Sequence, residues 1–263
     1  ETLNDTILEE AQGGFDLEKR YPLYLVMFLY LVNLTQPDNT KLEKPIKPSL
    51  PLMEVAKTMA AKLPQHVLMI QVLNAGYVEM TLSWICNVQR FLGVIDRTLF
   101  IATDQDAYES LKRFDNNLNV VLHEHITPKS VKYGQYSYYD LMLFRTKMLT
   151  SLLNAGISLF LTESDAVWLS NPIDYVLNFK GETPTSVPDI VTMSDVEKES
   201  SQYPMLQGGF QLLRATEPTK QIWNDLTKKF ARIMEKYHKG QQMESKGNEQ
   251  LMLSGLTSKA KKE

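Results

Sequence analysis

The sequence contains a single cysteine, Cys86, so it cannot form an internal disulfide and does not belong to the disulfide-stapled scaffolds. Cys86 lies among apolar residues of a predicted helix, where we expect a buried structural thiol. An excess of charge is also missing, because 28 basic residues face 31 acidic ones. Without a basic surplus, the composition gives no support to nucleic-acid binding.

Long apolar runs are scarce. The most apolar stretch near the start, residues 23–34, is shorter than the roughly 20 residues that a membrane-spanning helix needs. We therefore expect an N-terminal helical segment at 1–35, followed by a proline-rich linker at 36–51 and, at the other end, a polar tail at 257–263. Two Asn-x-Thr sequons, at Asn4 and Asn33, favour a secretory compartment.

Between residues 52 and 256, apolar runs of strand length alternate with segments of helical periodicity. The predicted strands are 66–73, 98–103, 119–124, 157–162, 189–194 and 209–214. The predicted helices are 77–92, 105–113, 138–154, 218–237 and 248–256. Strands that are apolar throughout and separated by helices indicate an α/β domain with a parallel sheet covered on both faces.

The stretch LFLTESDAVWLSNP, residues 159–172, interrupts an apolar run with two carboxylates, Glu163 and Asp165. In an extended chain this spacing puts both side chains on one side and Ser164 on the other. Neighbouring carboxylates repel unless a cation lies between them. Mn²⁺ and Mg²⁺ accept such oxygen ligands and leave positions open for phosphate oxygens, so we predict a metal site, with a simple turn as the alternative.

The helix before this stretch carries two cations. Arg145 falls on the apolar stripe of the predicted helix 138–154, whereas Lys147 points away from it. A core-facing guanidinium needs a partner. An acid of the 163–165 loop or a substrate diphosphate would serve, and a purely structural ion pair is the alternative. Lys147 by itself is typical of a solvated surface lysine.

Polar residues also follow other predicted strands. Asn74, Asp104 and the 163–165 loop each come directly after one, and ligands of parallel sheets bind beyond the carboxyl ends of the strands. We therefore expect one site built from three segments. Gly76 permits close approach of an anion or nucleotide at a helix N-terminus. The glycine pair at 208–209 would let a ligand pack against the backbone, with a tight bend as the alternative.

The segment LLNAGISLFLTESDAVWLSNP resembles the acidic-motif region of nucleotide-diphospho-sugar transferases. In that family a helix ends at Gly, an apolar strand follows, and then come an Asp-x-Asp (DXD) motif and a Trp and Pro ending. Further pieces occur in the family's order: VLNAGYVEMTLSWICNVQ, TLFIATDQDAYESL, LQGGFQLLRATEPT and NEQLML. The resemblance covers about residues 66–256 and points to the retaining enzymes that form α-xylosyl, α-galactosyl and arabinosyl linkages.

The resemblance implies a GT-A fold, which is a Rossmann-like, mostly parallel sheet flanked by helices. It also implies a UDP-sugar donor and a divalent cation, usually Mn²⁺, bridging the diphosphate. Glu163 and Asp165 would bind the metal, with Glu163 standing where the family has Asp. Asp165, Arg145 and Gln207 would be catalytic, with Gln207 in the place of an Asn. The donor would be bound by Asn74, Gly76, Tyr77, Thr103, Asp104, Lys147, Ser164, Gly208 and Gly209.

Together these residues predict a metal-dependent glycosyltransferase of the Golgi or another secretory lumen. It would move a sugar from a UDP-sugar to a hydroxyl of a glycan, glycoprotein or other acceptor, with retention. Two alternatives stay open: an inactive relative that binds a glycan or protein partner, and a hydrolase of phosphate esters. A membrane anchor outside this sequence is equally open.

Overall fold

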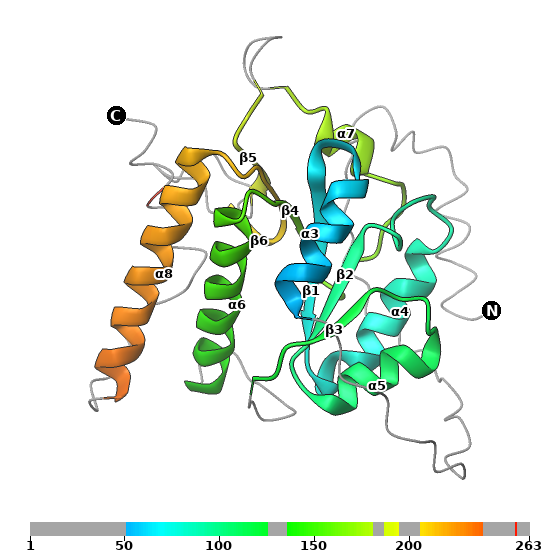
Figure 1. Ribbon diagram of the computed structural model, residues 1–263, viewed down its shortest axis with the longest axis horizontal. Helices are drawn as coiled ribbons and strands as arrows, with labels where there is room; N and C mark the ends of the chain where they lie inside the picture. The colour runs from blue at the N-terminus through cyan, green and yellow to red at the C-terminus, as the bar shows by residue number, and fades with distance from the viewer. Residues whose placement is uncertain (1–50, 126–135, 181–186, 195–205, 239–255, 257–263) are drawn as a thin grey trace, which may run out of the picture.

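The computed structural model describes residues 51–125, 136–180, 187–194, 206–238 and 256. Its described strands form one six-stranded sheet in the order β3-β2-β1-β4-β6-β5 (Figure 1). The strands are β1 (Val67–Leu73), β2 (Thr98–Ala102), β3 (Val120–Leu122), β4 (Ser158–Thr162), β5 (Ile190–Ser194) and β6 (Leu206–Leu213). Strands β1 to β4 pair in parallel, and β6 runs antiparallel to β4 and β5. The predicted α/β fold with a mostly parallel sheet is confirmed.

Helices cover both faces of this sheet (Figure 1). One face packs against α3 (Leu52–Lys62), α6 (Tyr136–Asn154) and α8 (Glu217–His238). The other packs against α4 (Val78–Val88), α5 (Gln105–Phe114) and α7 (Ile173–Leu177). The predicted segments 1–35, 36–51, 248–256 and 257–263 lie outside the described residues, apart from residues 51 and 256.

Local chemistry explains where these helices begin and end. Asp104 begins α5 by accepting a hydrogen bond from the backbone N–H of Ala107 at 2.8 Å, as an N-cap residue does. Helix α6 ends at Asn154, and Gly156 follows with a φ of 82°, a left-handed conformation that costs glycine little. Both boundaries agree with the sequence signals.

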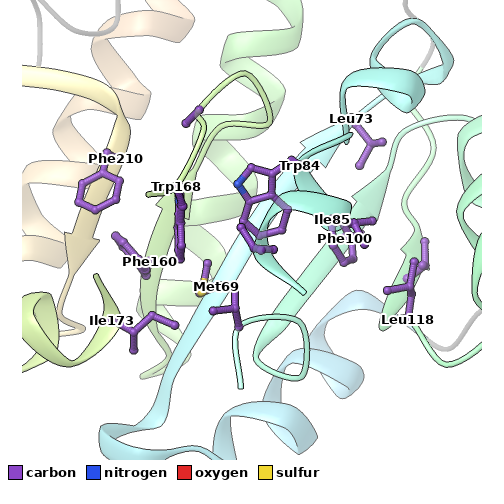
Figure 2. Packing of buried hydrophobic residues seen from close by; sticks show 14 of the residues in the cluster. Met69, Leu73, Trp84, Ile85, Phe100, Leu118, Phe160, Trp168, Ile173 and Phe210 are labelled. Carbon is purple, nitrogen blue, oxygen red and sulfur yellow. The ribbon is translucent and has the colours of Figure 1, made fainter. Parts of the chain in front are cut away.

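The core on the α4 face is rich in aromatic side chains. Figure 2 shows Trp84, Phe100, Phe160 and Trp168 among its members. The rings of Trp84 and Trp168 meet edge to face, with centroids 5.7 Å apart. Because Trp168 lies five residues beyond Glu163, its burial fixes the far end of the acidic loop to the core.

One prediction about α4 is wrong. Cys86 is exposed, because the buried positions of the helix are Thr81, Trp84, Ile85 and Val88, and Cys86 lies outside that stripe. As for membranes, none of the described helices is both long enough and apolar enough to cross a bilayer.

Candidate functional site

A cavity of about 460 Å³ lies at the carboxyl ends of β1 and β4. The parallel register places Ile70 beside Leu161, so these two strands end close together. Because β6 is antiparallel to β4, its first residues reach the same edge of the sheet. The cavity is lined by residues 70–74, 161–165 and 207–209, by Gln211, by Tyr77, Met80 and Thr81 near or on α4, and by Tyr138, Leu141, Met142 and Arg145 on α6.

The cavity gathers most of the residues that the sequence assigned to a site. Those that line it are Asn74, Tyr77, Arg145, Glu163, Ser164, Asp165, Gln207, Gly208 and Gly209. They come from the ends of β1 and β4, the start of β6 and the middle of α6. The structure therefore brings the segments that follow β1 and β4 together at one cavity, whereas β2 supplies none of the lining residues.

Four of the assigned residues do not line the cavity. Asp104 links two turns instead, since its Oδ2 accepts from the backbone N–H of Ala75 at 2.8 Å while its Oδ1 caps α5. The N–H of Gly76 donates to Oδ1 of Asn74 at 3.0 Å. Thr103 is buried beside these turns and Lys147 is exposed on α6.

The acidic loop is held by the backbone of β6. The N–H of Glu163 donates to the carbonyl oxygen of Gly209 at 3.1 Å. The chain then turns at Ser164 and Asp165, so the expected extended conformation is wrong at this point. Both carboxylates nevertheless line the same cavity, because the turn follows directly on the paired end of the strand.

Arg145 joins α6 to the acidic loop and to β6. Its Nη2 donates to the carbonyl oxygen of Gly208 at 3.0 Å, and its Nη1 lies 3.4 Å from Oε1 of Glu163. The Arg145 side chain is only 14% exposed, whereas that of Glu163 is 49% exposed. The predicted pairing of Arg145 with an acid of this loop is therefore present. The other carboxylate oxygen of Glu163, Oε2, is the atom nearest to the position that a Cβ of residue 209 would take.

Gly209 leaves room for the Glu163 side chain in this position. A Cβ atom added at residue 209 would lie 2.6 Å from Cδ of Glu163, closer than Cβ contacts in proteins come. At Gly208 an added Cβ would meet nothing within 4 Å. Only the second glycine of the pair therefore makes room for the acidic side chain.

The electrostatics of the cavity favour a cation. Partial desolvation in the cavity wall, followed by the charge of Glu163, raises the pKa of Asp165. Burial and then the two carboxylates raise the pKa of Tyr77. Of the described residues that line the cavity, those with charged side chains are Arg145, Glu163 and Asp165, which gives a formal charge of +1 − 2 = −1.

The two carboxylates are suitable ligands for a hard divalent cation, but they do not by themselves complete its coordination. No group of three or more His, Cys, Asp or Glu residues is close enough to hold a metal within the part of the chain that the structure describes. Mg²⁺ and similar ions are often held by one or two carboxylates together with substrate phosphates. The donor set of Glu163 and Asp165 is of that kind. Desolvation first and the charge of Glu163 second raise the pKa of Asp165, and a bound cation would offset both effects by stabilising the ionised carboxylate.

Sequence reasoning missed several polar residues in the cavity wall. Gln71, Thr81, Thr162 and Gln211 all line the cavity and are buried. A signal was available for the two glutamines, since each is a lone amide inside an apolar strand, in VLMIQVL and in GFQLLR. The threonines carried no comparable signal, because threonine is common both in strands and in helix faces.

Comparison with models of known protein families identifies the family of this chain. A family model described as nucleotide-diphospho-sugar transferase matches residues 93–259, which is more than half of the chain. The match contains the acidic loop, α6 and β6, and begins after β1 and α4. A search among individually curated proteins gives no match. The matched length is sufficient to conclude that the chain belongs to the nucleotide-diphospho-sugar transferase family.

Proposed function

We propose that this protein transfers a sugar from a UDP-sugar to an acceptor hydroxyl, with retention, with Mn²⁺ or Mg²⁺ bound at Glu163 and Asp165. Family membership supports glycosyl transfer from a nucleotide sugar. The observation that carries the more specific proposal is the pair of carboxylates at the cavity formed by the strand ends. A glycan or glycoprotein acceptor in a secretory lumen completes the proposal, and the two sequons favour that compartment.

The net charge of the cavity indicates a role for each of its three charged residues. A bare diphosphate would be repelled by the net negative charge of Glu163, Asp165 and Arg145. A divalent cation, when bound, would neutralise the diphosphate and the charge that develops on it as it leaves. Glu163 and Asp165 would hold that cation. Arg145 keeps Glu163 in place from its position against Gly208 and adds a positive charge on the same side.

Retention requires no side chain to act as a base. The bond between the anomeric carbon and the UDP oxygen breaks, and the new bond to the acceptor oxygen forms on the same face of the sugar. The acceptor proton then passes to a phosphate oxygen of the departing UDP. The part of the protein is to align donor and acceptor and to stabilise the leaving group.

The first test is thermal unfolding of the protein with UDP alone, with Mn²⁺ alone and with both. A ligand at about 100 times its Kd stabilises a protein by roughly 2.7 kcal/mol. We expect a large shift of Tm only with both ligands, and we expect it to vanish in Asp165→Asn. Asp96→Asn is the matched control, since Asp96 is exposed in the loop before β2, at the opposite end of the strands.

Turnover then separates the possible activities. Release of UDP from a panel of UDP-sugars, faster with hydroxyl acceptors than without, would support transfer. Release of phosphate without an acceptor would indicate a hydrolase instead. Binding of UDP and Mn²⁺ without turnover of any donor would indicate an inactive relative. A well-folded protein that shows no shift with UDP and Mn²⁺ would overturn the proposal.

A further inference from the structure

Several polar atoms in the cavity wall have no hydrogen-bond partner. Among the described residues, they are both amide atoms of Gln71, the hydroxyls of Thr81 and Thr162, and Oε1 of Gln207. Gln71 is 3% exposed, Thr81 0% and Thr162 4%. Buried polar groups in native proteins are normally hydrogen-bonded, so a group of exceptions around one cavity calls for an explanation.

Gln71 and Thr162 lie on the sheet face that α4 covers, and Thr81 lies on α4 itself; we refer to the three as the neutral polar cluster. Gln71 lies two residues from both Met69 and Leu73, so its side chain is on the same face of β1 as theirs, which point into the α4-side core (Figure 2). Thr162 is two residues after Phe160 of the same core, and Thr81 is one turn before Trp84 and Ile85 on α4. The cluster therefore forms the α4 side of the cavity wall.

The chemistry of the cluster selects its ligand. An amide and two hydroxyls are uncharged, and each can both donate and accept hydrogen bonds. They match the hydroxyl groups of a sugar ring, which are also neutral and also donate and accept. Phosphate or carboxylate groups would find no positive charge among them. The charged residues that line the cavity lie elsewhere. Glu163 and Asp165 are in the loop after β4, and Arg145 is on α6.

We propose that Gln71, Thr81 and Thr162 bind ring hydroxyl groups of the nucleotide sugar and contribute to the choice of donor. This inference rests on the proposed function, because it assigns a part of the same donor site. The hydroxyls belong either to the transferred sugar or to the ribose of the nucleotide. The terminal torsion of a glutamine side chain is soft, so a small rotation of Gln71 suffices to turn its amide toward a ligand in the cavity.

The test compares Gln71→Met and Thr162→Val with the wild-type protein. Both substitutions keep the approximate volume of the side chain and remove its hydrogen-bonding groups. Gln211→Met is the matched control for folding, because Gln211 lines the same cavity and is equally buried, but its Nε2 donates to the carbonyl oxygen of Gln207 at 2.7 Å. Affinities are measured by calorimetry for UDP and for UDP-sugars in the presence of Mn²⁺, and Tm is measured without ligand.

We expect Gln71→Met to weaken binding of the preferred UDP-sugar by at least tenfold. Weakening of the UDP-sugar without weakening of UDP assigns the cluster to the transferred sugar, and equal weakening of both assigns it to the ribose. Without ligand, Gln71→Met should raise Tm by about 2–4 °C, because it removes an unpaired buried amide. Gln211→Met should lower Tm, because it removes a hydrogen bond that is made.

Two results would overturn the inference. Unchanged affinity for UDP and UDP-sugars in Gln71→Met and Thr162→Val would show that the cluster serves only internal water. A fall in Tm of Gln71→Met as large as that of Gln211→Met would show that the amide is already satisfied. Failure of the proposed function looks different, because the wild-type protein itself would then bind neither UDP nor any UDP-sugar.

Discussion

The contact between Gly209 and Glu163 offers the sharpest test of how the site is built. In Gly209→Ala the new methyl group would overlap Cδ of Glu163, from which it would lie 2.6 Å away. The Glu163 side chain is half exposed, so it can swing away into solvent instead of disrupting the strand. We therefore expect the acidic side chain to leave its position while β6 stays folded.

The structure indicates that this costs little stability. Moving Glu163 breaks its 3.4 Å ion pair with Arg145, which is mostly buried but keeps its hydrogen bond to the carbonyl oxygen of Gly208. Because Glu163 is half exposed, the pair is worth about 1 kcal/mol. Replacing glycine by alanine reduces the entropy of the unfolded chain, which stabilises the protein by about 0.4–1 kcal/mol. The two terms nearly cancel. Cation affinity should nevertheless fall by more than about tenfold, the lower range seen when the surroundings of a metal ligand are disturbed.

The assay is calorimetric titration with Mn²⁺ in the presence of UDP, together with the free energy of unfolding in urea. Gly208→Ala is the matched control, since an added Cβ there meets nothing within 4 Å. The control should bind Mn²⁺ as the wild-type protein does, with unchanged or slightly greater stability. Equal Mn²⁺ affinity in Gly209→Ala and Gly208→Ala would refute the reasoning, because the position of Glu163 would then not depend on the missing side chain.

Three further predictions concern other parts of the same domain. Asn87→Ala should lower the free energy of unfolding by about 1–3 kcal/mol, because Asn87 makes two hydrogen bonds to the backbone of Trp168; chemical denaturation measures this. Asp104→Ala should lower the free energy of unfolding in chemical denaturation by about 1–3 kcal/mol, because it removes the cap of α5 and the hydrogen bond from the N–H of Ala75, with Mn²⁺ affinity unchanged. Burial, followed by the nearby His125, lowers the pKa of His123, so the folded state binds fewer protons than the unfolded state, and stability should fall as pH drops below 6.5. His123→Gln should reduce that loss between pH 7.5 and 5.5, and an unchanged pH dependence would contradict the assignment.

The elements of the fold were predictable because their signals are local. An apolar run of strand length identifies β2, predicted at 98–103 and observed at Thr98–Ala102. A side chain that caps a helix start and a glycine after a helix end act within a few residues, as Asp104 and Gly156 show. The antiparallel direction of β6 carried no local signal, since strand direction depends on how the whole chain packs.

The candidate site was likewise predictable in part from the sequence and in part only from the tertiary structure. The sequence by itself determined that Glu163 and Asp165 follow a buried strand and that Arg145 lies on a core-facing stripe. Only the tertiary structure decided that Gly209 makes room for Glu163, and that the amide of Gln71 is buried without a partner. The reason is physical. A residue's type and spacing fix what it can bond to, whereas the partners it meets or lacks come from strands and helices that are distant in the chain and that only packing brings together.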